Sequence, residues 1–120
     1  MAALVPALLA LALAGCGESS ASYHSGVLAL SAGEFEISPE SVTMPAGQVR
    51  IELRNDGVLV HEVAVANADG RILGQTGAVF PGRSGESAPF ALAPGTYRVY
   101  DPGANYADLG MYGSLRVLGR

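Results

Sequence analysis

Short segments in which apolar and polar residues alternate recur along most of this chain. Residues 48–54 (QVRIELR) alternate strictly, with three apolar side chains on one face and three charged side chains on the other. Residues 96–101 (TYRVYD) alternate in the same way, whereas residues 60–66 (VHEVAVA) are β-branched with little polarity. These patterns predict two strands with one face against a core and a third strand that is buried on both faces.

Turn signals separate the predicted strands. Asn55-Asp56-Gly57 follows the first of them and Pro94-Gly95 precedes the second. Residues 115–118 (LRVL) are expected to close the domain, and shorter candidate strands lie at 27–30, 34–37, 71–73 and 89–92. After residue 26, no segment has the periodicity of an amphipathic helix of about ten residues. Many short strands between turns predict an all-β sandwich.

The N-terminal region has the pattern of a targeting segment. Residues 2–14 form an apolar run that is shorter than the roughly 20 residues of a membrane-spanning helix. The run ends in LAGC, which resembles the lipobox of bacterial lipoproteins, so we expect Cys16 to carry the lipid. No Lys or Arg precedes it, and we therefore expect translation to begin upstream. The predicted organisation is a signal peptide at 1–15, an acylated cysteine and flexible tether at 16–26, and one domain at 27–120.

Composition narrows the classes of function. The chain of 120 residues has a net charge of −4 and seven basic residues without a basic cluster, which argues against nucleic-acid binding. Its single cysteine is Cys16, so acylation leaves no thiol for chemistry in the folded domain. No nucleophile and base occur at a recognisable spacing, so we do not expect an enzyme. The predicted location is the bacterial cell envelope, facing the periplasm or the exterior.

Two long segments carry the motifs of a known family: residues 90–117 contain PGTY and GMYG, and residues 33–65 read GEFEISPESVTMPAGQVRIELRNDGVLVHEVAV. They resemble the cupredoxins, the family of plastocyanin and azurin. Residues 90–117 resemble the C-terminal hairpin of that family, with PGTY before the ligand loop and GMYG after it. Residues 33–65 resemble their first half, in which these residues fall where the family places them: Phe35, Pro39, Gly47, Val49, Asn55, Gly57 and His61. The resemblance implies a Greek-key cupredoxin-like β-sandwich.

In copper-binding relatives, the resemblance implies a site of two histidines, one cysteine and usually an axial methionine. The first histidine maps onto His61 and the methionine onto Met111. The cysteine position maps onto Asp101, which strand parity directs inward. Residues 102–110 contain no histidine, and Tyr106 is the nearest positional match to the second one.

The missing thiolate decides what this site can be. Blue copper requires a cysteine thiolate with two imidazoles, so no blue site is expected. A weaker Cu(II) site remains chemically sensible, built from the His61 imidazole and the Asp101 carboxylate with Tyr106 or Asn105 as a further donor. Equally, His61 could be a core histidine, Met111 packing alone, and Asp101 a turn cap.

Two readings of function therefore stand side by side. The first is a metal-free scaffold or interaction module, or a weak copper-binding protein, anchored to the membrane by its N-terminal lipid. The alternative is a copper-binding electron-transfer or copper-handling protein with a non-thiolate site, whose partner is a redox or copper-handling protein. Copper is the only cofactor that either reading suggests.

Overall fold

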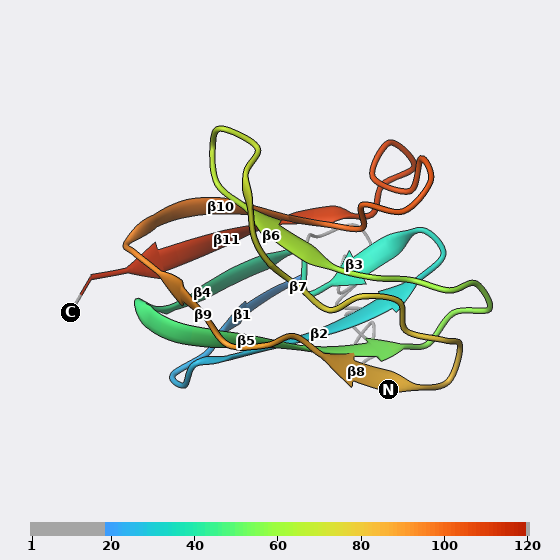
Figure 1. Cartoon of the computed structure of the whole chain (residues 1–120), viewed down its shortest axis with the longest axis horizontal. Coiled ribbons are helices and arrows are strands. Elements are labelled where there is room, and N and C mark those ends of the chain that lie inside the picture. The colour runs from blue at the N-terminus through green and yellow to red at the C-terminus, as the bar shows by residue number, and fades with distance from the viewer. Residues whose placement is uncertain (1–18, 120) are drawn as a thin grey trace, which may run out of the picture.

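The computed structural model describes residues 19–119, in which eleven strands form two layers (Figure 1). The six-stranded sheet contains, in spatial order, β1 (Ser20–Ser22), β4 (Ser41–Pro45), β11 (Tyr112–Leu118), β10 (Gly95–Tyr100), β6 (Ala64–Ala66) and β7 (Ile72–Gln75). The second sheet contains β3 (Glu36–Ser38), β2 (Val27–Gly33), β5 (Gly47–Asn55) and β8 (Ser84–Glu86), and β9 (Phe90–Leu92) also pairs with β5. The predicted all-β sandwich is confirmed.

Parallel and antiparallel pairs are mixed in both layers. β2 runs parallel to β5, and β4 runs parallel to both β1 and β11. The hairpin β10–β11 and the pair β10–β6 are antiparallel. These pairings are consistent with a Greek-key sandwich. No helix in the described part of the chain is long and apolar enough to cross a membrane.

The alternating residues of both sheets build the core between the layers. In β5, Val49, Ile51 and Leu53 are each at most 1% exposed, as the alternation of this segment predicts. They face the buried residues of β10 and β11, among them Val99 and Leu115. Fully burying such a side chain contributes about 1.5–3 kcal/mol, so this core is the main source of stability.

The structure begins earlier than the predicted domain boundary. Residues 20–22 form β1 on the edge of the six-stranded sheet, within the segment that was predicted to be a flexible tether. The Tyr23 hydroxyl donates to the carbonyl of Ala29 at 2.6 Å, and the Tyr23 amide donates to Thr43. Because these contacts satisfy the backbone and bury the ring in part, residues 20–23 belong to the sandwich. The predicted signal peptide and Cys16 lie outside the described residues.

The predicted strand at 60–66 is mostly not a strand. Only Ala64–Ala66 forms β6, whereas His61 makes an isolated bridge with Val79. Asn55 explains the difference, because its amide group binds Leu59 and Val79 and holds this part of the chain as a loop. Sequence patterning also did not predict β4, a short strand in which Val42 and Met44 alternate with less buried residues, or β8, which contains no large apolar residue.

Four connections gather at one end of the sandwich, on the right in Figure 1. They are the β2–β3 turn, the loop at 56–60, the loop at 80–83 and the loop at 101–111. The candidate residues lie at this end, which is called the loop end below.

Candidate functional site

His61 is fixed in place by its own backbone and by Asn55. Its amide donates to the carbonyl of Val79 at 3.1 Å, and its carbonyl accepts from the Val79 amide at 2.7 Å. The Asn55 side chain donates to the carbonyls of Leu59 and Val79 at 2.7 and 2.8 Å. The Asn55 oxygen also accepts from the Gly57 amide at 2.9 Å. These bonds hold the imidazole, whose side chain is fully buried, at the loop end.

Asp101 lies beside His61, as the strand parity of residues 96–101 predicts. Its Oδ2 is 2.8 Å from His61 Nδ1, and both side chains are inaccessible to solvent. Its Oδ1 accepts from the amide of Gly103 at 2.8 Å, so the carboxylate also closes the turn after β10. Asp101 therefore caps the turn after β10 with one oxygen and contacts His61 with the other. The two interpretations of Asp101, as a turn cap and as a residue at a ligand position, do not exclude each other.

Glu34 completes the site from the β2–β3 turn. Its Oε1 lies 3.0 Å from His61 Nε2 and accepts from the amides of Val58 and Leu59 at 2.9 and 2.8 Å. The Leu59 amide is the main cause that holds the pKa of Glu34 below its ordinary value, with smaller contributions from His61 and the Val58 amide. Burial opposes this shift and raises the pKa. Sequence reasoning missed Glu34, because a glutamate in a turn carries no periodic signal.

These three side chains form a carboxylate–imidazole–carboxylate arrangement, called the Glu34–His61–Asp101 network below. Asp101 Oδ2 lies 2.8 Å from Nδ1 and Glu34 Oε1 lies 3.0 Å from Nε2, so each ring nitrogen faces a carboxyl oxygen. The imidazole therefore joins three segments of the chain through hydrogen bonds at both of its nitrogens.

Tyr106 packs against the imidazole, and Met111 lies in the same loop. The Tyr106 ring meets the His61 ring edge-on, with centroids 5.1 Å apart, and lies 5.7 Å from the Phe35 ring. Met111 is fully buried; its amide donates to Tyr106 and its carbonyl accepts from Asp101, both at 3.0 Å. The structure thus brings His61, Asp101 and Tyr106 together, and Met111 closes their loop through its backbone.

The donor set does not fit a blue copper centre. The described residues contain no thiol, and His61 is the one imidazole at the mapped ligand positions. The two carboxylates occupy opposite nitrogens of its ring, so a metal bound at either nitrogen is turned away from the carboxylate at the other. Within residues 19–119, no three His, Cys, Asp or Glu side chains are arranged around a common point where a metal ion could sit.

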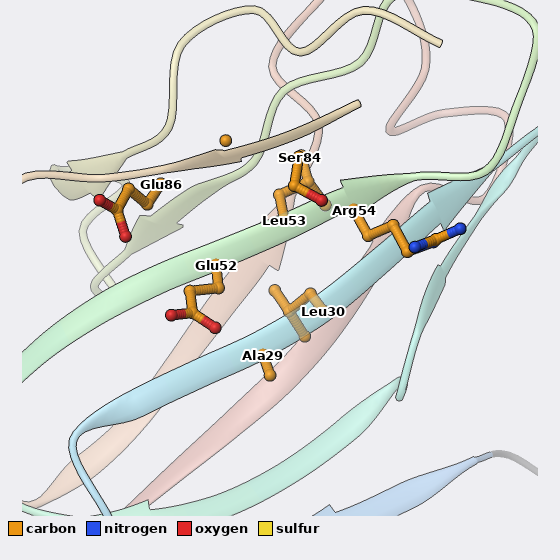
Figure 2. A pocket seen from close by; sticks show the side chains of 8 residues that line it. Ala29, Leu30, Glu52, Leu53, Arg54, Ser84 and Glu86 are labelled. Carbon is orange, nitrogen blue, oxygen red and sulfur yellow. The ribbon is translucent and has the colours of Figure 1, made fainter. Parts of the chain in front are cut away.

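A separate pocket lies on the outer face of the five-stranded sheet, lined by residues of β2, β5 and β8 (Figure 2). The charged groups there are largely compensated, because Arg50 lies 2.7 Å from Glu52 and 3.2 Å from Glu86. The second contact lacks hydrogen-bond geometry, so it is an ion pair only. The pocket therefore offers few free polar groups, and the loop end remains the better candidate site.

Comparison with known proteins gives solved structures only. No family model matches the chain, and no curated protein matches it. A dithionite-reduced auracyanin from Roseiflexus castenholzii is 20% identical with a TM-score of 0.70, over 80% of this chain and 99% of that one. Auracyanin A from Chloroflexus aurantiacus, described as a "blue" copper protein, is 16% identical with a TM-score of 0.62, over 78% and 100%.

A third solved structure extends the likeness beyond the auracyanins. Rusticyanin from Thiobacillus ferrooxidans is 18% identical with a TM-score of 0.63, over 82% of each chain. Identities at this level establish a shared fold and leave function to the residues of the site. With its mixed sheets and its loop end, this chain has the cupredoxin fold.

Proposed function

We propose that this chain is a lipid-anchored, extracytoplasmic protein that keeps the cupredoxin fold with a degenerate, non-blue site, and that it acts as a metal-free interaction module at the bacterial cell envelope. The observation that carries the proposal is the Glu34–His61–Asp101 network. Both nitrogens of the imidazole are engaged by carboxylates, so neither is free to bind a metal without the loss of a hydrogen bond.

The network supports a metal-free role in a second way. It joins the β2–β3 turn, the chain at residue 61 and the end of β10, which are far apart in sequence. A bound metal ion would link the chain in a similar manner, because its ligands come from separate segments. Here hydrogen bonds already provide that link, and the loop end can be ordered without a cofactor. We assign no catalytic residue.

Metal content tests this proposal. The full chain is expressed in copper-supplemented medium, purified in detergent and analysed by mass spectrometry for metals. We expect well below one copper per chain and no intense visible band, since a thiolate-to-copper band requires a thiolate. One copper per chain that is lost in both His61→Ala and Asp101→Ala would instead establish a non-thiolate site. His24→Ala is the control, because His24 is exposed and remote from the network.

One observation favours the second candidate, a copper-handling or electron-transfer protein with a non-thiolate site. His61 Nδ1 and Asp101 Oδ2 are 2.8 Å apart, so two donors that suit Cu(II) lie side by side. Tyr106 and Met111 are the further candidate donors at this site. Such a protein would pass copper or electrons to a redox or copper-handling partner, and the same metal analysis with the same variants decides between the two candidates.

The anchor is tested separately. We expect the mature protein to fractionate with membranes and Cys16→Ser to remain unprocessed at the lipobox. The mass of the N-terminal peptide reports acylation directly. Acylation that persists in Cys16→Ser, or a mature N-terminus at another residue, would contradict the assignment.

A further inference from the structure

We propose that the loop end of the sandwich docks onto the lipid bilayer that holds the anchor. The inference rests on the proposed acylation of Cys16. It concerns the orientation of the domain, which acylation by itself does not fix. Three independent features of the structure support it: where apolar side chains are exposed, where the chain enters the fold, and which charges surround the exposed residues.

Exposed apolar side chains concentrate at the loop end. Six of the nine large hydrophobic residues that are exposed in the described structure lie on the β2–β3 turn and on the loops at 56–60, 80–83 and 101–111. Together they are called the apolar rim: Phe35, Val58, Leu59, Val60, Phe80 and Leu109. Val58 is 81% exposed and Phe80 is 61% exposed. Exposed apolar residues that gather in this way mark surfaces for partners or membranes.

The contacts beneath the apolar rim hold its members around one site. Glu34 binds the amides of Val58 and Leu59, which fixes the loop at 56–60 beside Phe35. The Phe35 ring lies against Tyr106, in the loop that also carries Leu109. Phe80 follows Val79, which pairs with His61. The rim therefore surrounds the Glu34–His61–Asp101 network, and its backbone is fixed before any partner binds.

The chain enters the sandwich in the half that carries the loop end. The carbonyl of Ser19 accepts from the amides of Glu40 and Ser41, both at 3.0 Å. Ser41 pairs with both Ser20 and Ser114, and Ser114 lies near the start of β11. β11 starts directly after the loop at 101–111, and β1 and β4 run in the same direction away from the loop end.

The length of the connection limits how far the domain can move from the lipid. Two residues, Gly17 and Glu18, separate Cys16 from Ser19, which makes three steps from one Cα atom to the next. Because consecutive Cα atoms are 3.8 Å apart, an acylated Cys16 lies within about 11 Å of Ser19. The half of the sandwich that contains the loop end is therefore held against the membrane surface. Docking of the apolar rim removes apolar area from water without stretching the connection.

The charges beside the apolar rim indicate which membrane surface it suits. The chain has no lysine, and the exposed residues next to the rim include Glu36 and Asp108 as well as Arg83. An acidic boundary is repelled by anionic lipids, and salt screens the repulsion. The occupant that fits is a zwitterionic surface, into which the apolar side chains insert to the depth of the headgroups.

Single tryptophans test the orientation, because the chain contains none. Leu109→Trp places the probe on the apolar rim, and Leu118→Trp places it near the end of β11, with similar exposures of 48% and 42% in the parent residues. Each acylated variant is reconstituted into phosphatidylcholine–phosphatidylethanolamine vesicles that contain bromolipids. We expect a blue shift and strong quenching for Leu109→Trp and neither for Leu118→Trp.

Further experiments distinguish a failure of docking from a failure of the lipid anchor. Adding Val58→Glu and Phe80→Glu to Leu109→Trp should abolish the quenching while acylation, read from the N-terminal mass, is retained. Anionic vesicles at low salt should reduce quenching, and added salt should restore it. Equal quenching of both probes, or quenching of Leu118→Trp alone, in an acylated protein overturns the docking and leaves the anchor in place. A protein that is not acylated at Cys16 overturns the anchor and the docking together.

Discussion

At the scale of single residues, buried polar groups determine how the loop end is held. Asn55 is fully buried and uses its amide group for three bonds that order the loop at 56–60. His61 and Asp101 have no access to solvent, so the hydrogen bond between them is formed without competition from water. A buried polar group that loses its partner is costly. Substitutions here should therefore be more harmful than their small change in volume suggests.

Asn55→Ala is the first test at this scale. It removes the hydrogen bond to the buried Val79 carbonyl and the partly buried bonds to the Leu59 carbonyl and the Gly57 amide, and a buried polar group that loses its partner costs about 1–3 kcal/mol. We expect a loss of about 3 kcal/mol or more in the free energy of unfolding, measured by urea denaturation. Asn67→Ala is the matched control, because Asn67 makes similar bonds in an exposed hairpin. Equal losses would show that burial is not the cause.

Glu34 predicts a pH dependence of stability. Its pKa in the folded state is lowered from the ordinary value of 4.5, chiefly by the Leu59 amide. The ionised carboxylate therefore stabilises the fold above pH 4.5, and this contribution is lost as the pH falls through the folded pKa. The difference in stability between the wild type and Glu34→Gln should shrink as the pH is lowered below that value. Glu36→Gln, an exposed neighbour, is the control, and an unchanged difference would contradict the role of Glu34.

At the scale of elements, edge strand β1 and the loop at 101–111 are the two parts of the sandwich that specific contacts hold in place. β1 has only three residues, yet it pairs in parallel with β4 and is followed by Tyr23, whose hydroxyl donates to the carbonyl of Ala29. The loop at 101–111 is closed by backbone bonds among Asp101, Tyr106 and Met111. Each element therefore has a specific contact that a substitution can remove.

Tyr23→Phe tests whether residues 20–23 belong to the fold. It removes the 2.6 Å hydrogen bond to Ala29 and keeps the ring. We expect a loss of about 1 kcal/mol, the usual contribution of such a bond. Tyr112→Phe is the control, because Tyr112 is 55% exposed. An unchanged melting temperature for Tyr23→Phe would indicate that residues 20–23 are a tether that does not contribute to the stability of the domain.

The loop at 101–111 can be tested as a ligand loop by restoring what it lacks. The double variant Asp101→Cys with Tyr106→His would combine the introduced thiolate and imidazole with His61 and Met111. Asp101 already lies 2.8 Å from His61 Nδ1, and the Tyr106 ring contacts the His61 ring. We expect an intense visible band when Cu(II) is added, because the soft thiolate ligand is then present.

Asp101→Cys alone is the control for this variant and should give a weaker or unstable band. A folded double variant that binds copper without the band would show that the ligand mapping is wrong in detail.

At the scale of the whole molecule, two features predict how stability responds to copper: residues 19–119 contain no thiol, and the Glu34–His61–Asp101 network engages both nitrogens of the imidazole. A ligand that binds only the folded state adds about 2.7 kcal/mol at a concentration of one hundred times its Kd. For a metal-free module we expect no rise in Tm on addition of Cu(II), measured by thermal denaturation in weakly coordinating buffer. A rise that His61→Ala removes would support the copper-handling candidate. Zn²⁺ in parallel controls for non-specific binding.

The sequence by itself determined the sandwich and the approximate position of the site. Alternation in residues 48–54 and 96–101 reports which side chains face the core, because strand periodicity is local. The same periodicity directs Asp101 inward, and the structure places it against His61. The inward or outward direction of these side chains therefore follows from the alternation within each segment alone.

Only the tertiary structure decided what surrounds the imidazole. Glu34 reaches His61 from 27 residues upstream, and Asn55 turns the predicted strand at 60–66 into a loop by binding Val79, 24 residues away. Neither contact leaves a periodic trace, because each depends on where two distant segments meet after folding. The alternation predicts which side chains point inward, whereas the packing of the loop end determines that a carboxylate occupies each nitrogen of the buried histidine.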